Sequence, residues 1–296
     1  YSSFDWGQFK VGSWIPLRLA FFNQNNFLGQ VQLLLKKRFK ICFGWASGGL
    51  CLLSCKDLPE ILSALREYFK DCYFLLRFHF FDELAGAKSF QLCQHLQRAQ
   101  KTINSGFSIF HSFENVSEKT FSSNHRYYLK KSLKNDLSIS FGSKVPLSSF
   151  TLLHNEMTEN KNLDSLKINS EEISRLASLF GERLIPCMVF KADQPVAGCL
   201  ILRWENTAYY FLAAANEQGR ELFASYFMVR ELFSFLAEKG VVHFDFGGIT
   251  PFSENAFGVN KFKMGFGGKV TQYLGEWDLS NSDLLRILFN KVYLRK

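Results

Sequence analysis

The sequence lacks an apolar run long enough to cross a membrane as a helix. Its longest candidate, residues 41–53, is interrupted by Ser47, Gly48 and Gly49, whereas a spanning helix needs about 20 consecutive apolar residues. Residues 1–10 also lack the order of a signal peptide, and the chain begins without Met, so we interpret this start as trimmed. These features predict a soluble or peripheral protein.

Cysteine pairs and metal-binding patterns are missing as well. The seven Cys are an odd number, none forms a Cys-x-x-Cys pair, and most lie inside apolar runs. Such usage is typical of reduced, buried thiols in a cytosolic protein. No spacing of Cys and His matches a zinc site, so we expect no metal.

The common signatures of nucleophilic and nucleotide-binding enzymes are absent too. The chain contains no Gly-x-Ser-x-Gly, no His-Glu-x-x-His, no Gly-x-x-x-x-Gly-Lys-Ser/Thr and no Gly-x-Gly-x-x-Gly. The six His are scattered, and each is more typical of a structural residue than of a catalytic one. We therefore expect neither a catalytic triad nor a phosphate-binding loop of these types.

Positive charge is concentrated in the first half of the chain. Residues 1–150 hold 19 Lys and Arg against 10 Asp and Glu (+9), whereas residues 151–296 hold 16 against 17 (−1). This asymmetry favours a polyanionic partner. One basic cluster spans residues 36–40. The other comprises Arg126, Lys130, Lys131 and Lys134, whose spacing predicts a basic ridge along one helix face, with a solvated face that has no partner as the alternative.

Helical and β-like segments alternate along the chain, which predicts a mixed α/β fold. The sequence predicts a basic helix over the ridge and other helices and strands as follows: helices at 58–69, 89–104, 149–159, 170–180 and 220–239; strands at 72–80, 137–141, 186–191, 196–204, 207–213 and 241–246. A break at residues 142–146 indicates a domain boundary. We therefore predict two domains, residues 1–143 and 144–280, which suggests a duplicated fold, and a basic C-terminal helix at 281–296. Most of the 33 Phe are expected in the cores.

Two glycine-rich stretches late in the chain are the best candidates for chemistry. A strand ending in Asp245-Phe246-Gly247-Gly248 places a carboxylate at its terminus, followed by residues that allow close approach of backbone or ligand. Residues 258–269 form a second predicted turn with three Lys, whose cations and amides suit an anionic or oxyanionic group. The alternative is that both stretches are ordinary structural turns.

These stretches resemble the C-terminal signature of the Fem-type peptidyltransferases. The resemblance comprises Asp-Phe-Gly-Gly-Ile at 245–249, Gly-Val-x-x-Phe-Lys-x-Gly-Phe-Gly-Gly at 258–268 and Tyr-x-Gly-x-Trp-Asp at 273–278. Weaker similarities are Trp6-x-x-x-Lys10, Arg126-x-x-x-Lys130-Lys131, and Tyr226 in the sequence Ser-Tyr-Phe-x-x-x-Glu-Leu. The resemblance implies two tandem acetyltransferase-like (GNAT) domains.

The same resemblance implies an aminoacyltransferase. The donor would be aminoacyl-tRNA, an ester that needs no further cofactor, and the acceptor an amine of a UDP- or lipid-linked peptidoglycan precursor. Lys263, together with Phe262, would stabilise the oxyanion, and Asp245 would orient the amine. Substrate contacts would come from Lys10, Arg126, Tyr226, Lys130, Gly247 and Gly248.

Other readings stay open. Residues 216–220 do not fit the pyrophosphate loop of acyl-CoA-dependent acetyltransferases, and no coiled-coil arm for tRNA is evident. An N-acyltransferase acting on a nucleotide sugar with acyl-CoA or acyl carrier protein is one alternative. A non-catalytic protein that binds nucleic acid or anionic lipid is another. The expected location is the bacterial cytoplasm, with peripheral contact to the inner membrane face left open. The amphipathic tail at 284–296 could bind that membrane surface, but we expect it to pack on the first domain.

Overall fold

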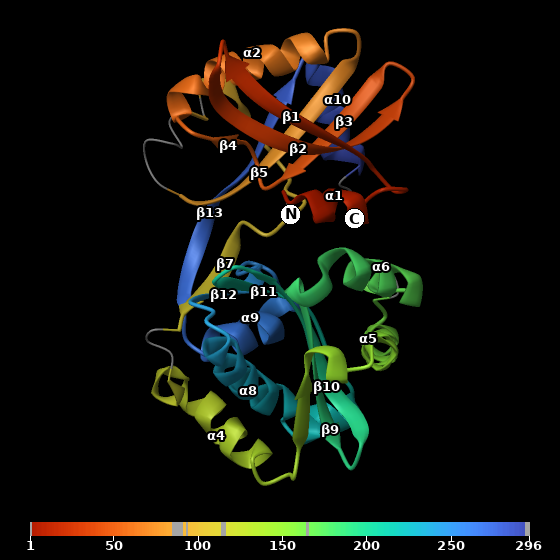
Figure 1. The fold of residues 1–296 in the computed structure, drawn as a ribbon, viewed down its shortest axis with the longest axis vertical. Helices are drawn as coiled ribbons and strands as arrows, with labels where there is room; N and C mark the ends of the chain where they lie inside the picture. Colours follow the sequence, from red (N-terminus) through yellow and green to blue (C-terminus); the bar gives the residue numbers. More distant parts are fainter. Residues whose placement is uncertain (1, 85–90, 93, 114–116, 164–165, 294–296) are drawn as a thin grey trace. The chain divides into compact units, whose positions relative to one another are not determined.

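The chain forms two compact units that do not coincide with its two sequence halves. The structure, a computed structural model, describes residues 2–84, 91–92, 94–113, 117–163 and 166–293. Unit 1 comprises Tyr1–Phe107 and Gln272–Lys296, and unit 2 comprises Ser108–Thr271 (Figure 1). The chain therefore enters unit 2 once and returns to unit 1 for its last strand and helix.

Unit 1 is built on a mixed sheet. Its strands lie in the order β1-β2-β3-β5-β13, with β4 paired to β2 and β6 paired to β13. β3 and β5 are parallel, and the other described pairs are antiparallel. The elements are α1 (Phe4–Phe9), β1 (Ile15–Asn23), β2 (Asn26–Arg38), β3 (Ile41–Ser47), β4 (Cys51–Leu52), α2 (Leu58–Tyr68), β5 (Tyr73–Glu83), β6 (Gln97–Arg98), β13 (Lys269–Ser280) and α10 (Asp283–Leu288).

The core of unit 1 lies between α2 and this sheet. Leu58, Ile61 and Leu65 form the buried face of α2, with the three- and four-residue spacing of an amphipathic helix. They join one apolar cluster with Leu33 of β2 and Phe74 of β5. Burial of this face fixes α2 on the sheet, as the helical pattern of residues 58–69 predicted.

The C-terminal segment closes unit 1 through a buried polar network. The Arg77 guanidinium donates to both carboxylate oxygens of Asp278, at 2.7 and 2.9 Å, and to Oδ1 of Asn290 at 3.0 Å. Glu276 lies 3.5 Å from the same guanidinium and accepts hydrogen bonds from the backbone at residues 103 and 104. Because Phe289 also stacks on Phe43, the predicted tail belongs to unit 1 as far as the structure describes it.

Unit 2 carries a second mixed sheet, in the order β7-β12-β11-β10-β9-β8. β11 and β12 are parallel, whereas β8, β9, β10 and β11 pair antiparallel in sequence. The elements are β7 (Phe107–Ser112), α4 (Ser123–Ser132), β8 (Ser138–Phe141), α5 (Leu147–Asn160), α6 (Ser170–Phe180), β9 (Leu184–Lys191), β10 (Gln194–Trp204), β11 (Thr207–Ala215), α7 (Glu217–Glu221), α8 (Ala224–Glu238), β12 (His243–Ile249) and α9 (Phe257–Gly265).

Helices cover both faces of this second sheet. α5 contacts β10 and β11, and α8 contacts β9, β10 and β11. Figure 1 shows the two helices on opposite sides of these strands. The mixed α/β class predicted from the sequence is therefore confirmed, with one layered sheet in each unit. Within the described residues, no helix is both long and apolar enough to cross a membrane.

Three predicted elements need correction. Residues 258–265, predicted as a turn, belong to helix α9. The helix predicted at 220–239 is broken at Phe223, whose φ of 56° is left-handed, so α7 and α8 are separate. The helix predicted at 89–104 does not continue beyond residue 95, because residues 97–98 pair with β13; its residues 89, 90 and 93 lie outside the described ones.

The domain boundary also differs from the predicted one at residues 143/144. Residues 108–141 belong to unit 2. β8 pairs with β9, and α4 contacts α8. The side-chain amide of Asn135 donates to the Leu222 carbonyl at 2.9 Å. The basic helix therefore packs against the second half of the chain, although it lies in the basic first half of the sequence.

Candidate active site

The Asp-Phe-Gly-Gly segment lies inside a strand of unit 2 and not at its end. Asp245 is the third residue of β12, and its Oδ1 accepts hydrogen bonds from the Ser108 hydroxyl and, at 2.8 Å, from the Gly247 amide. Gly247 has a φ of +78°, which disfavours any residue with a Cβ. The carboxylate therefore holds a local kink of β12 in place.

Lys263 reaches this kink from the last turn of α9. Its Nζ donates to the Gly248 carbonyl at 2.9 Å, and it would lie 3.6 Å from a Cβ placed on Gly247. Burial lowers the pKa of Lys263 to about 8, and the nearby charge of Asp245 partly opposes this shift. Lys263 therefore carries its cation beside a carboxylate and has a pKa close to physiological pH.

Tyr209 completes this group of side chains. Tyr209 of β11 is paired with Asp245 of β12 in the sheet, and its hydroxyl would lie 3.5 Å from a Cβ on Gly247. Ser108 and the phenol of Tyr209 were not predicted from the sequence, whereas Gly247 was. Together these residues make a small polar surface around Gly247 and Gly248.

A buried histidine of α4 fixes the other side of α9. His125 Nε2 lies 2.8 Å from the Phe262 carbonyl, and Nδ1 lies 2.9 Å from the Ser122 hydroxyl. A carbonyl only accepts, so Nε2 carries the proton and Nδ1 accepts from Ser122. Burial lowers the pKa of His125, against the opposing effect of the bond to Phe262, so we assign a neutral ring.

This contact accounts for the glycine of Phe-Lys-x-Gly. A Cβ on Gly265 would lie 1.9 Å from Cε1 of His125, far inside any van der Waals contact. The Gly265 carbonyl also accepts from the Ser122 amide at 2.8 Å. Gly265 is therefore required by a neighbouring side chain, and no turn is needed to explain it.

Aromatic rings pack around Phe262, the residue before Lys263. The Tyr226 ring lies 5.3 Å from Phe262 and 4.9 Å from His125, between centroids. Phe266 is fully buried and packs 5.0 Å from Phe262. Burial raises the pKa of Tyr226, and the neighbouring Tyr128 raises it further, so Tyr226 is a neutral phenol. The predicted residues Phe262 and Tyr226 thus pack against each other.

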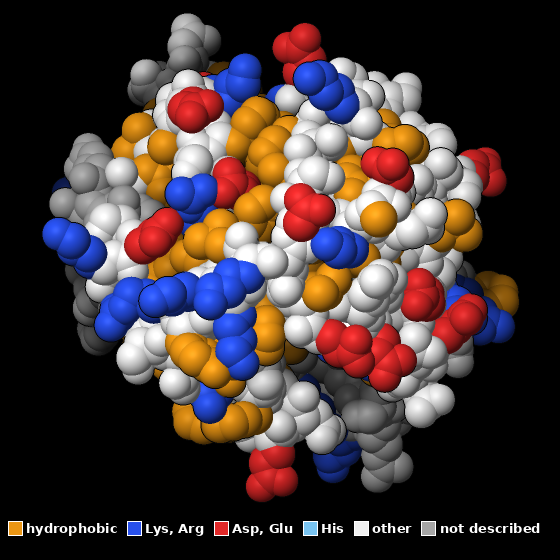
Figure 2. Space-filling model, turned by 90° about the horizontal axis from the view of Figure 1, so that it is seen from below, with side chains coloured by type: hydrophobic (Ala, Val, Ile, Leu, Met, Phe, Trp, Pro, Cys, Tyr) orange, Lys and Arg blue, Asp and Glu red, His pale blue; other side chains and the backbone are white. Residues whose placement is uncertain are grey.

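The predicted basic residues lie elsewhere. Arg126 and Lys130 are on the exposed face of α4, where Arg126 donates to the carbonyls of Phe121 and Lys119. Figure 2 shows a row of Lys and Arg side chains next to hydrophobic ones on the face that carries α4. Lys131 lies 4.7 Å from the Tyr127 ring, and Lys134 follows the end of the helix. The basic ridge therefore lies on the same helix as His125, which contacts α9 at the Phe262 carbonyl.

Lys10 lies in unit 1, whereas Lys263 lies in unit 2. Its Nζ is 4.7 Å from the Trp6 ring and 4.8 Å from the Phe9 ring. The predicted role of Lys10 in gripping phosphates stays a prediction, as do the substrate roles of Arg126 and Lys130. Among the residues that the structure describes, no three His, Cys, Asp or Glu side chains are grouped to hold a metal ion.

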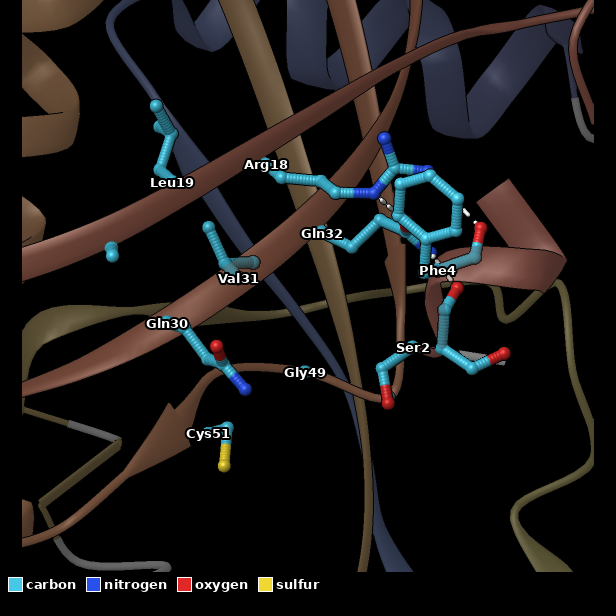
Figure 3. Close-up of a pocket in the computed structure, with 12 residues that line it drawn as sticks. Ser2, Phe4, Arg18, Leu19, Gln30, Val31, Gln32, Gly49 and Cys51 are labelled. Carbon is cyan, nitrogen blue, oxygen red and sulfur yellow. Dashed lines mark hydrogen bonds between the residues drawn. The ribbon is translucent and has the colours of Figure 1, made fainter. Parts of the chain in front are cut away.

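Unit 1 has a separate cavity next to α1. It measures about 430 Å³ and is lined by Ser2, Ser3, Phe4, Arg18, Leu19, Ala20, Gln30, Val31, Gln32, Gly48, Gly49 and Cys51. Figure 3 shows Arg18 reaching over Phe4 toward Gln32. Arg18 Nε donates to Gln32 Oε1 at 2.8 Å, and Nη2 donates to the Phe4 carbonyl at 3.1 Å. This volume suits a sugar ring or a short peptide with polar groups.

Comparison with known proteins finds a family model that matches part of the chain. Residues 187–293, which include Asp245 and Lys263, match the model of the FemAB family. The chain also resembles the crystal structure of FemX with a TM-score of 0.83, at 15% identity, over 98% of this chain and 94% of that one. The second half of the chain therefore resembles the FemAB family, and the fold of the whole chain resembles that of FemX.

Two further structures are similar to this chain in fold. The C-terminal domain of a putative lysylphosphatidylglycerol synthetase from Agrobacterium fabrum has a TM-score of 0.61 at 11% identity, over 97% of this chain and 90% of that one. A tandem GNAT protein from the clavulanic acid pathway has a TM-score of 0.56 at 10% identity, over 89% and 82%. These similarities confirm the tandem GNAT-like fold. A search of curated proteins found no match.

Proposed function

We propose that this protein transfers an aminoacyl group from an ester on tRNA to an amine of a peptidoglycan precursor. The observation that carries the proposal is the placement of Lys263 over the Gly247-Gly248 kink beside Asp245, in the part of the chain that matches the FemAB family. The proposed setting is the cytoplasm, where charged tRNA is made.

The chemistry needs no nucleophilic side chain. The acceptor amine attacks the ester carbonyl, a C–N bond forms, and the C–O bond to the tRNA ribose breaks. The amine loses a proton and the ribose oxygen gains one. The Lys263 ammonium would stabilise the negative charge that develops on the carbonyl oxygen, and its pKa of about 8 suits transfer of a proton to the leaving oxygen.

The surrounding residues would position this cation. Asp245 already accepts two hydrogen bonds at Oδ1. We therefore assign it two roles, to hold the kink of β12 and to favour the charged form of Lys263. These roles replace the predicted one of orienting the acceptor amine. His125 fixes the Phe262 carbonyl, and with it the last turn of α9. Tyr226 would contribute a neutral wall to the acyl group or acceptor.

The acceptor is proposed as a UDP- or lipid-linked stem peptide. Arg126 and Lys130 offer cations for its phosphates on unit 2, and Lys10 offers one on unit 1. The cavity beside α1, with Arg18 in its wall, is our candidate for the sugar or peptide part. The similarity to a putative lysylphosphatidylglycerol synthetase supports a second candidate acceptor, the glycerol hydroxyl of an anionic lipid.

The test is a transfer assay with the full chain. Purified protein is incubated with a pool of radiolabelled aminoacyl-tRNA and, in separate reactions, UDP-linked stem peptide, lipid-linked stem peptide or phosphatidylglycerol vesicles. Acetyl-CoA replaces the tRNA in a parallel set. Product masses identify donor and acceptor. Substituting Lys263→Met keeps most of the length of the side chain and removes its charge, and is expected to lower kcat by about 10²–10³-fold.

Lys261→Met is the matched control, because Lys261 lies on the same helix with an exposed side chain. It should leave kcat within twofold of the wild type. Arg18→Met should raise KM for the precursor and leave kcat unchanged. The proposal fails if no acceptor receives an aminoacyl group from tRNA, or if Lys263→Met and Lys261→Met behave alike.

A further inference from the structure

The turn between β2 and β3 presents an unusual side chain to solvent. Phe39 is 95% exposed at the tip of a two-residue turn. Its φ of 53° is left-handed, a conformation that favours glycine and disfavours a bulky residue. A large apolar side chain is therefore held outward at a position where the backbone alone would favour glycine. Neither the fold nor the proposed transfer uses it.

An apolar groove runs along the same end of β2. It measures about 630 Å³, and its lining includes Val11, Trp14, Ile15, Ile41 and Phe43. Val11, Ile15 and Ile41 are 43%, 58% and 48% exposed. Aliphatic residues thus extend the apolar surface well beyond Phe39.

Basic residues form the rim of this groove. Lys36, Lys37 and Arg38 line it, and Lys40 follows Phe39 in the turn. All four are exposed, and none forms an ion pair with a described residue. Unit 1 as a whole carries 17 Lys and Arg against 10 Asp and Glu, whereas unit 2 carries 18 against 17. The surplus positive charge of the protein therefore belongs to the unit that carries this groove.

We propose that this surface, Phe39 with the groove and its basic rim, docks the protein on an anionic phospholipid bilayer. Basic side chains attract anionic headgroups, and an exposed Phe with neighbouring aliphatic residues inserts at the boundary of the acyl chains. Nucleic acid is the less suitable polyanion, because base stacking uses aromatic planes and gains nothing from Val11, Ile15 and Ile41.

Vesicle sedimentation tests the proposal. The full chain is mixed with vesicles of phosphatidylcholine, with or without 30 mol% phosphatidylglycerol at about 0.1 M salt. We expect at least tenfold stronger binding to the anionic vesicles. Lys37→Gln with Lys40→Gln should lower the partition coefficient about fivefold for each charge removed. Phe39→Gly removes the inserted side chain while relieving the backbone, so it should bind at least tenfold more weakly and stay as stable as the wild type.

The control lies at the other end of β2, on the neighbouring strand β1. Phe22 is 59% exposed beside the β1–β2 turn, roughly 40 Å along β2 from Phe39. Phe22→Ser should leave vesicle binding unchanged. Three results would overturn the proposal. The first is equal binding to neutral and anionic vesicles, and the second is an equal loss of vesicle binding in Phe22→Ser and Phe39→Gly. The third is that the protein binds tRNA but not anionic vesicles, and that the Phe39 and Lys variants weaken the tRNA binding.

Discussion

Replacing Gly265 by Ala sets two physical effects against each other in the turn that carries Lys263. Gly265 is the last residue of α9, and its φ is not left-handed. Helix propensity alone predicts that Ala stabilises such a site by up to about 1 kcal/mol. The structure predicts the opposite, because the new Cβ would lie 1.9 Å from a carbon of the His125 ring.

The cost follows from what must move. An ordinary contact needs about 3.5 Å or more, so the ring and the helix turn must separate by more than 1 Å. That separation breaks the 2.8 Å hydrogen bond from His125 to the Phe262 carbonyl. Overpacking costs about 1–3 kcal/mol, and a buried hydrogen bond left unmade costs about 1–3 kcal/mol. Together these costs are about 2–6 kcal/mol, and the helix-propensity gain offsets about 1 kcal/mol of them, so we expect Gly265→Ala to destabilise unit 2 by about 1–5 kcal/mol.

Hydrogen-exchange mass spectrometry in urea is the suitable assay, because peptides from residues 108–271 report unit 2 separately from unit 1. Gly258→Ala is the matched control. It lies in the same helix with no atom within 4 Å of the new Cβ, so it should be neutral or stabilising. In a His125→Ala background, Gly265→Ala should cost less than about 1 kcal/mol, because the obstructing ring is gone.

Equal effects of Gly265→Ala and Gly258→Ala would refute the steric argument. Equal costs of Gly265→Ala with and without His125 would refute the role of the ring. In either case the link from α4 to the turn of Lys263 would have to be abandoned.

Three further predictions concern separate parts of the chain. Because burial lowers the pKa of Lys263 to about 8, its ammonium is present below that pH and lost above it. The rate of transfer should therefore decline above about pH 8 in pH–rate profiles. In Lys263→Arg this decline should move to higher pH. Arg77→Met leaves Asp278 buried without its cation and should destabilise unit 1 by about 3–5 kcal/mol in urea titrations, whereas a neutral result would contradict the network. Asp193→Gly should raise the Tm of unit 2 by about 2–4 °C, because φ is 63° at that turn residue; a lower Tm would show that the Asp side chain matters more than the backbone.

Local signals predicted the regular parts of unit 2 well. The helix at residues 170–180 has a capping box from Asn169 to Glu172 and ends at Gly181, so its bounds follow from the sequence. The two strands of the β9–β10 hairpin were likewise predicted, at 186–191 and 196–204. The break at Phe223 was not, because a left-handed residue there is not a glycine and its ring stacks on Tyr128, far away in the sequence.

The candidate site was predicted only in the part that a single stretch of sequence encodes. Asp245, Phe262 and Lys263 were identified from the motifs. Their partners Ser108 and His125 each lie 137 residues from the residue they bond, and no local pattern marks them. The same limit explains α9: four glycines between 258 and 268 indicated a turn, whereas Gly265 serves a tertiary contact that the sequence does not reveal.

The division of charge between the units changes what the basic composition implies. The sequence halves suggested one polyanionic partner for one basic domain. The structure moves the α4 ridge into unit 2, where His125 connects it to the turn of Lys263, while the surplus charge remains in unit 1 beside Phe39. Phosphates of the substrates and headgroups of a bilayer can then be bound by different surfaces, the first including the α4 ridge and the second the residues around Phe39. If so, Lys130→Gln should change KM for a UDP-linked, water-soluble precursor and leave vesicle binding unchanged. Phe39→Gly should weaken vesicle binding and leave KM for the same precursor unchanged. Loss of both activities in either variant would instead mean that one polyanion uses both surfaces.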